Sequence, residues 1–163
     1  MKNLFKTLLM VILLVTNFAG SVAIAEDDGV RKVVYHADFS DPRRFSAMLT
    51  SINNMVLHYQ NELVDYDVRI VFVAHGIRFV TNEALKNTPF AEDKAMVERR
   101  ESNTGRLSTL VTMHEVKLEL CDITRLGIGL NKSKLHDGVE LVPSGVVRIA
   151  ELQSQGFSYI KVE

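Results

Sequence analysis

Short apolar runs alternate with amphipathic stretches along most of the chain. The runs are rich in β-branched residues and are bounded by polar or turn residues, which is typical of buried strands. We expect strands at residues 31–37, 67–74, 116–120, 138–142 and 157–162. Because strands that alternate with helices form βαβ units, the pattern predicts a mainly parallel sheet of about five strands with helices on both faces. The expected fold class is α/β, as a single three-layer α/β/α domain.

The first two helices differ in how clearly the sequence marks them. Asp41 and Pro42 begin a helix in which apolar residues recur every three or four positions as far as about Asn61. Residues 87–105 instead carry charges of alternating sign, which is typical of a solvated helix face. We expect Gly105 to interrupt this second helix before the apolar spacing resumes.

Two shorter helices are expected in the second half of the chain. Asp122 can cap a helix that runs to about Asn131, although two glycines inside it each weaken it by roughly 1 kcal/mol and favour a short or mobile element. Residues 143–145 open a last helix, which Gly156 ends. The sequence shows no internal repeat and no linker, so we assign residues 26–163 to one domain.

The N-terminal segment does not follow this alternation. A basic start precedes an uncharged apolar run at residues 8–15, and residues 23–25 (Ala-Ile-Ala) match the pattern that signal peptidase accepts. We therefore expect a signal peptide at residues 1–25 and a periplasmic or secreted mature protein. The alternative is a retained membrane anchor at residues 7–25, close to the length of about 20 residues that spans a bilayer. Polar and small residues in its second half favour cleavage.

Composition and charge exclude several function classes. With 47% hydrophobic residues, three prolines and nine glycines, the chain is neither disordered nor fibrous. The chain has 19 basic and 20 acidic residues, and the signal segment holds two of the lysines, so the mature charge is 17 − 20 = −3. A mildly acidic surface does not favour binding to nucleic acid phosphates or to anionic lipids. We expect no nucleic-acid partner and, after cleavage, no membrane partner.

Reactive side chains fall at the carboxyl ends of three predicted strands, where ligands bind in open parallel sheets: His36, His75 and Cys121. Cys121 is the only cysteine, so it cannot form an internal disulfide. It precedes a predicted helix, whose N-terminus stabilises the nucleophilic thiolate, and Arg125 would add positive charge while Asp122 would oppose ionisation. The alternative interpretations are a buried, unreactive thiol and a cysteine that links two chains.

His75 and Gly76 form the exit of the second predicted strand. An imidazole there could serve as a base or a ligand, since glycine allows close backbone approach. His36, His75 and Cys121 together have the chemistry of a zinc or copper site, but the sequence contains no compact pair of metal ligands. It also contains no dinucleotide fingerprint, catalytic triad order or P-loop spacing. We expect no metal and no cofactor.

Several stretches resemble the DsrE/DsrF-like (YchN-like) family. They are residues 33–36 (VVYH), 52–54 (INN), 70–76 (IVFVAHG), 116–121 (VKLELC) and the tail at 138–160. The resemblance covers nearly all of the mature chain and rests on the order and spacing of these stretches. It implies a small α/β/α domain that commonly assembles into homo-oligomers, trimers and hexamers among them. Some members relay sulfur as a persulfide on the matching cysteine.

By this resemblance, the leading hypothesis is an exported DsrE-like protein that binds or relays sulfane sulfur through Cys121, a sulfurtransferase-like activity. His75 would assist as a base, and His36, Gly76 and Arg125 would contribute to binding. The expected partners are sulfur donor and acceptor proteins or small thiols. The alternatives are a non-catalytic oligomeric binding or assembly module with a structural cysteine and, less favoured, a His/Cys metal-binding protein.

Apolar residues outside the predicted core faces suggest where subunits would meet. Patches of this kind on exposed elements mark interfaces, and closed symmetric homo-oligomers are the common outcome. By resemblance we expect a trimer or a multiple of it, with Cys121 near a subunit boundary that residues 87–105 help to cover. The residues expected on such patches are Ile77, Phe79, Val80, Leu85, Pro89, Phe90, Ala91 and Met96.

Overall fold

The computed structural model describes residues 29–162; the expected signal peptide at residues 1–25 lies outside them. Five strands form one parallel sheet in the order β4-β3-β2-β1-β5. The strands are β1 (Arg31–Ala37), β2 (Tyr66–Phe72), β3 (Lys117–Cys121), β4 (Val139–Val142) and β5 (Ser158–Lys161). The predicted parallel α/β sheet is confirmed, with strand ends within two residues of those expected.

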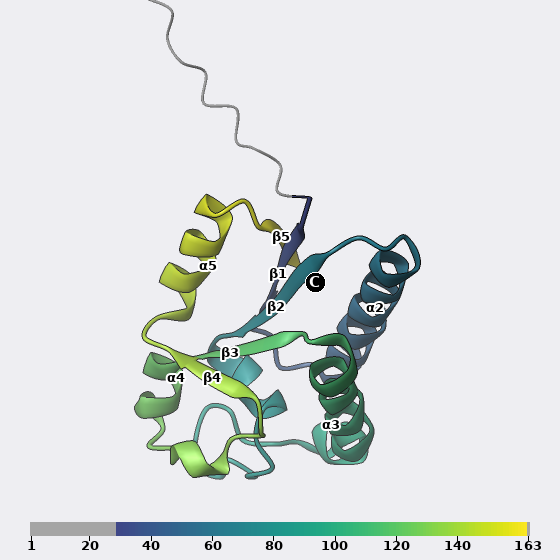
Figure 1. The fold of residues 1–163 in the computed structure, drawn as a ribbon. Helices are drawn as coiled ribbons and strands as arrows, with labels where there is room; N and C mark the ends of the chain where they lie inside the picture. Colours follow the sequence, from purple (N-terminus) through teal and green to yellow (C-terminus); the bar gives the residue numbers. More distant parts are fainter. Residues whose placement is uncertain (1–28, 163) are drawn as a thin grey trace, which may run out of the picture.

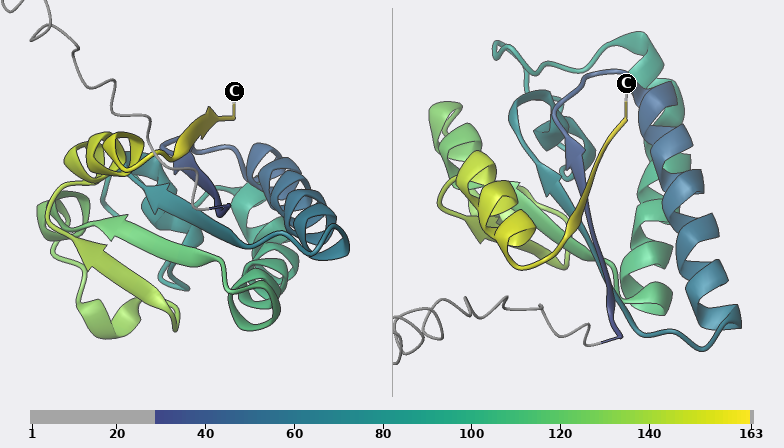
Figure 2. Two further views of the ribbon diagram at one scale, coloured as in Figure 1. Left: turned by 45° about the horizontal axis from the view of Figure 1, so that its top comes forward. Right: turned by 90° about the horizontal axis from the view of Figure 1, so that it is seen from above.

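Helices cover both faces of the sheet, as the views in Figures 1 and 2 show. α2 (Pro42–Asn61) and α3 (Lys94–His114) lie side by side on one face. The short α4 (Asp122–Gly127) and α5 (Gly145–Ser154) lie on the other. The three-layer α/β/α architecture is therefore present, and every strand points toward the same edge.

The face under α2 and α3 holds the larger apolar core. The predicted stripe of α2 supplies much of it, through buried Phe45, Met48, Leu49, Ile52 and Val56. Phe45 also stacks on Phe79 of the 3-10 helix η1 (Ala74–Phe79), with ring centroids 4.1 Å apart. Aromatic and aliphatic burial of this extent is the main source of stability in the domain.

The predicted interruption of the second helix is wrong, because α3 runs unbroken through Gly105. Its start is capped by Asp93, whose Oδ1 accepts a hydrogen bond from the Met96 N–H at 2.8 Å. Inside the helix, the buried Asn103 amide donates to the Pro42 carbonyl at 3.1 Å and accepts from the Ser46 hydroxyl at 2.7 Å. These tertiary bonds to α2 offset the low helix propensity of one glycine.

Two further expectations are corrected. The helix after Cys121 ends at Gly127 rather than near Asn131, and a separate 3-10 turn, η2 (Lys132–Lys134), follows it. Most of the predicted apolar patch is core: Ile77, Phe79, Val80, Leu85 and Met96 are buried, and Phe90 packs against them. These residues have no helical or strand period because the segment from η1 to α3 folds over the core as 3-10 helix and irregular chain.

Within residues 29–162, no helix is both long enough and apolar enough to cross a bilayer.

Candidate functional site

Cys121 lies at the junction of a strand and a helix. It is the last residue of β3 and the N-cap of α4, and it pairs in register with Val142 of β4. Leu118 and Leu120 of the same strand belong to the core under α2 and α3. By the two-residue alternation of a strand, Cys121 faces α5 instead. Its exposed fraction is 5%, so the thiol is enclosed by the start of α4 and the start of α5.

Backbone and hydroxyl groups at the starts of α4 and α5 lie next to Cys121. Burial acts to raise the pKa of the Cys121 thiol, but hydrogen bonds from the Gly145 N–H, the Thr124 N–H and hydroxyl, and the Ile123 N–H outweigh it. The net result is a pKa below the usual value. Because these groups stabilise negative charge, the thiolate, which is the nucleophilic form, is more accessible at Cys121 than in an ordinary cysteine.

The Thr124 hydroxyl is oriented by a neighbouring strand exit. Its Oγ1 accepts a hydrogen bond from the Ala74 N–H at 3.1 Å, which fixes the hydroxyl oxygen in the first turn after Cys121. Ala74 has a φ of 48°, in the left-handed region that alanine rarely adopts. Backbone strain of this kind persists where the surrounding structure requires it, and here it aims the Ala74 N–H at the site.

Gly145 approaches Cys121 so closely that only glycine fits. A Cβ at this position would lie 2.6 Å from Val73 Cγ2 and 3.0 Å from Cys121 Cβ. The Ser144 side chain caps the helix by accepting from the Val147 N–H, so the N–H of Gly145 remains free for the thiol. The first turn of α5 is therefore packed directly against the Cys121 side chain.

The charges next to Cys121 neutralise each other. Arg125 Nε donates to Asp122 Oδ1 at 2.6 Å, and Arg125 Nη1 donates to the Leu130 carbonyl at 2.7 Å. The guanidinium thus braces the end of α4 and the loop after it. Backbone and hydroxyl donors, rather than the expected charge of Arg125, lower the pKa of the thiol.

His75 and Gly76 lie in η1, beyond the end of β2. The His75 ring packs edge-on against Phe90 with centroids 5.2 Å apart, and His75 is not among the groups that hydrogen-bond to Cys121. Gly76 has a steric role, since a Cβ there would lie 2.0 Å from the Ala37 carbonyl oxygen. Both residues are near the site through Ala74, but the structure shows no direct contact with the sulfur.

His36 lies two strands away from Cys121. It pairs with Val71, which in turn pairs with Glu119, so it is displaced by two strand spacings, about 10 Å. Its Nδ1 is 3.0 Å from the Tyr159 hydroxyl of β5, and burial, partly opposed by Asp38, lowers its pKa. His36, His75 and Cys121 are therefore not brought together. In the part of the chain that the structure describes, no group of three His, Cys, Asp or Glu side chains is arranged to hold a metal ion.

Comparison with known protein families identifies the family of this chain. The DsrE/DsrF-like family matches residues 33–162, which include strands β2 to β5, most of β1 and both helix layers. The chain belongs to the DsrE/DsrF-like family. No curated protein matches the chain.

Solved structures share the fold of this DsrE/DsrF-like chain. A protein of unknown function, MTH1491 from Methanobacterium thermoautotrophicum, has a TM-score of 0.61 and 22% sequence identity over 80% of this chain and 98% of its own. The ychN protein from E. coli has a TM-score of 0.52 and 18% identity, with the same coverage of both chains. At these identities the similarity establishes the fold alone.

Sequence reasoning missed two residues that shape the thiol site of this DsrE/DsrF-like protein. Thr124 and Gly145 both lower the pKa of Cys121, yet neither was singled out for the site. The topology could have pointed to Gly145. In a parallel sheet, a helix begins at the edge where the preceding strand ends, and the neighbouring strand ends at that same edge. Gly145 begins the helix after β4, the neighbour of β3. For Thr124, only its position in the first turn after the cysteine pointed to the sulfur.

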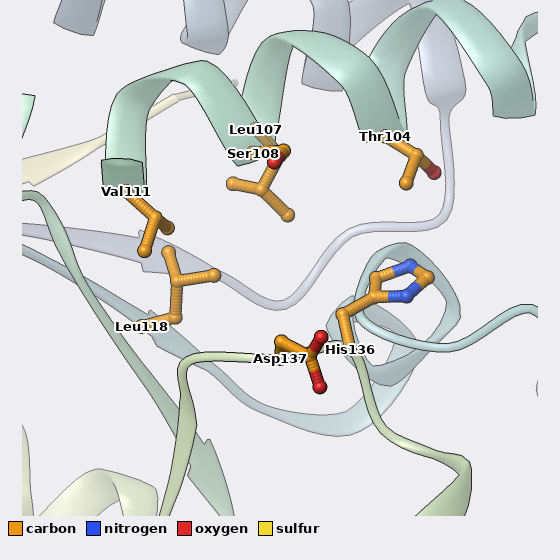
Figure 3. A pocket seen from close by; sticks show the side chains of 7 residues that line it. All are labelled: Thr104, Leu107, Ser108, Val111, Leu118, His136 and Asp137. Atoms are coloured by element: carbon orange, nitrogen blue, oxygen red, sulfur yellow. The ribbon is translucent and has the colours of Figure 1, made fainter. Parts of the chain in front are cut away.

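A cavity of about 200 Å³ lies elsewhere, under α3. Figure 3 shows its lining, in which His136 and Asp137 face Thr104 and Ser108 of α3. Leu118 forms part of its wall, which places the cavity on the face opposite to Cys121. His136 Nε2 is buried and has no hydrogen-bond partner among residues 29–162. The sheet separates this cavity from the thiol, so it is not part of the cysteine site.

Proposed function

We propose that this DsrE/DsrF-like protein relays sulfane sulfur through Cys121. The observation that carries the proposal is the position of Cys121 between β3 and α4 and against the start of α5, where N–H and O–H groups of Ile123, Thr124 and Gly145 lower its pKa. A purely structural cysteine needs no such donors, since a neutral thiol is only a weak acceptor. A thiolate held by several donors is ready to attack a sulfur atom at neutral pH.

The proposed transfer is an exchange without net oxidation. The Cys121 thiolate attacks the terminal sulfur of a donor persulfide, R–S–SH. A new S–S bond forms on Cys121, the donor S–S bond breaks, and the donor leaves as the thiolate R–S⁻. An acceptor thiolate then attacks the terminal sulfur on Cys121, and Cys121 returns to its thiolate form. The same donors that stabilise the resting thiolate stabilise Cys121 as the leaving group.

His75 has a supporting role in this proposal, as the base for an incoming acceptor thiol. It follows Ala74, which hydrogen-bonds to Thr124, so η1 is tied to the site. We propose that Gly76 and Arg125 keep η1 and α4 in place, through the close approach to Ala37 and the bonds to Asp122 and Leu130. His36 would contribute only to a ligand that extends across the sheet edge toward Tyr159.

Export and assembly are further parts of the proposal. Exposed apolar side chains flank the site on α4 and α5, and Ile123 and Val146 are 64% and 65% exposed. Apolar groups of this kind support a subunit or partner interface next to Cys121, in a homo-oligomer such as a trimer or hexamer. Donors and acceptors would be proteins or small thiols in the periplasm or outside the cell. Expression of the full chain, fractionation and intact mass test cleavage after Ala25, and light scattering tests assembly.

The decisive experiment is intact mass after incubation with polysulfide or thiosulfate. The purified wild-type protein should gain one sulfur atom, and a monothiol should remove it. Cys121→Ser should gain none, and Ser133→Ala, on an exposed turn away from the site, should behave as wild type. A wild-type protein that stays at its original mass under both donors would overturn the relay proposal.

A second function follows from the burial of Cys121. With an exposed fraction of 5%, the thiol could be inert in a non-catalytic binding or assembly module. Labelling with a small thiol reagent separates the two. Rapid labelling of the native protein supports relay. Labelling only after denaturation supports the structural role.

A further inference from the structure

A buried carboxylate lies beside the thiol and has no part in the sulfur chemistry described above. Glu119 precedes Cys121 by two residues on β3, so both side chains face α5. Glu119 is only 2% exposed. Acidic side chains are almost never buried to this extent unless they are paired, so its partners indicate what it does.

Glu119 is held from two sides by arginines. Arg148 of α5 donates twice, from Nε to Oε2 at 2.7 Å and from Nη2 to Oε1 at 2.9 Å. Arg69 of β2 donates from Nη1 to Oε1 at 2.9 Å. Burial acts to raise the pKa of Glu119, but the hydrogen bonds from Arg148 and Arg69 outweigh it, so its pKa lies below the usual value. The carboxylate is therefore ionised.

The sheet side of this network is braced by further charges. Arg69 forms a two-bond pair with Asp67, at 3.0 and 2.6 Å, and Lys117 donates to Asp67 Oδ2 at 3.1 Å. The Arg69 guanidinium also lies 5.2 Å above the centre of the Phe157 ring. Glu119 is thus fixed in the sheet, and its two bonds to Arg148 fix a helix to it.

That helix carries the donor for the thiol. Arg148 lies three residues after Gly145, one turn into α5. The two-bond pair between Arg148 and Glu119, called the fork below, therefore also sets the position of the first turn. The apolar anchors of α5, Ile149 and Leu152, pack against a small cluster further along the helix. Among the described side-chain hydrogen bonds between α5 and the sheet, the two from Arg148 to Glu119 lie nearest to Gly145.

We propose that Glu119 and Arg148 are a positioning pair that holds the first turn of α5, and with it the Gly145 N–H, against Cys121. The pair acts through the placement of α5 and does not touch the reacting atoms. Its importance for sulfur transfer rests on the proposed function, but the effect on the thiol itself does not.

For Glu119→Gln, the positioning role predicts a shift in the pKa of Cys121 opposite in sign to the shift expected from the lost charge alone. Glu119 is an anion near the thiol, and a nearby anion raises a thiol pKa. If its charge were all that mattered, Glu119→Gln would lower the pKa of Cys121. If Glu119 positions α5, the same substitution frees Arg148, moves the Gly145 N–H away and raises the pKa of Cys121.

The test is the pH dependence of Cys121 alkylation by iodoacetamide, with thiolate absorbance as a second measurement. We expect Glu119→Gln to raise the midpoint of the alkylation profile by about one pKa unit, which slows alkylation about tenfold at a pH below both midpoints. Arg148→Lys keeps the positive charge but loses the planar fork, and should shift the profile in the same direction. Glu151→Gln removes an exposed acid 3.8 Å from Arg148 without touching the fork, and should leave the profile unchanged.

The outcomes separate the possible explanations. If folded Glu119→Gln has an unchanged or lowered midpoint in the pH profile of Cys121 alkylation, the positioning role is overturned. Should Glu119→Gln fail to fold, Arg148→Lys, on a partly exposed helix side chain, decides by the same criterion. Raised midpoints together with a wild-type protein that gains no sulfur from polysulfide would retain the positioning pair and reject the relay. If the wild type gains sulfur and the variants have unchanged midpoints, the relay is retained and the positioning pair is rejected.

Discussion

The two faces of the sheet are built on different principles. Under α2 and α3 lies a large apolar core with stacked phenylalanines. Under α5, the buried apolar cluster found in the described residues has five members, and ion pairs centred on Glu119 accompany it. Cys121 lies on this second face. Stability is concentrated on one side of the sheet, so the other side can hold a thiol among directed polar contacts.

The largest expected effect tests the apolar face. Phe45 is 1% exposed and stacks on Phe79 at 4.1 Å, so Phe45→Ala leaves a large cavity. We expect it to lower the free energy of unfolding by about 3–5 kcal/mol, measured by urea denaturation. The variant that still folds should keep the wild-type pH profile of Cys121 alkylation. A large shift in that profile would contradict the separation of the two faces.

A smaller effect is expected from crowding the polar face. Gly145→Ala places a Cβ 2.6 Å from Val73 Cγ2, so the first turn of α5 must move away from the sulfur. We expect a loss of about 1–3 kcal/mol in stability and a rise in the pKa of Cys121, measured by urea denaturation and alkylation.

Gly105→Ala is the matched control for that substitution. Gly105 lies in α3, and an added Cβ would meet nothing within 4 Å. Because alanine favours the helix, we expect a gain of roughly 0.5–1 kcal/mol and no change at Cys121. Equal losses in stability from both glycine substitutions would show that the close approach at Gly145 does not distinguish the two positions.

The two faces also differ in how far the sequence predicted them. The stripe from Phe45 to Val56 could be predicted because a helix with one buried face has a regular apolar spacing. The strand at residues 31–37 could be predicted because a buried strand leaves an apolar, β-branched run. The continuity of α3 through Gly105 depends on the Asn103 bonds to α2, which no local pattern encodes. Tertiary contacts outweighed local propensity there.

The thiol site was predictable in its centre but not in its surroundings. Cys121 follows an apolar run, so its place at the sheet edge could be expected. The hydroxyl of Thr124 and the N–H of Gly145 reach it only because β3 and β4 are neighbours and α4 bends back at once. No single segment of the sequence determines the order of the strands. The sequence therefore placed His36 near Cys121, although two strand spacings separate them.

The smallest expected effect is a pH dependence of stability on the polar face. The folded pKa of Cys121 lies below its unfolded value of about 8.5, so the folded state binds its proton less tightly. The resulting stabilisation is fully present above the unfolded pKa and is lost as pH falls through the folded pKa. The stability difference between wild type and Cys121→Ser should therefore grow in favour of wild type as pH rises toward 9, measured by urea denaturation. A difference that stays constant with pH would mean that the donors do not stabilise the thiolate.

The separation of the donors along the chain has a consequence during synthesis. Ala74 orients Thr124 from a segment made long before Cys121, whereas Gly145 is made after it and must return across the sheet edge. A nascent chain that has not yet folded α5 onto β3 therefore lacks the contribution of Gly145 and keeps only those of Ile123 and Thr124. The environment that lowers the pKa of Cys121 is complete only when the last helix has docked.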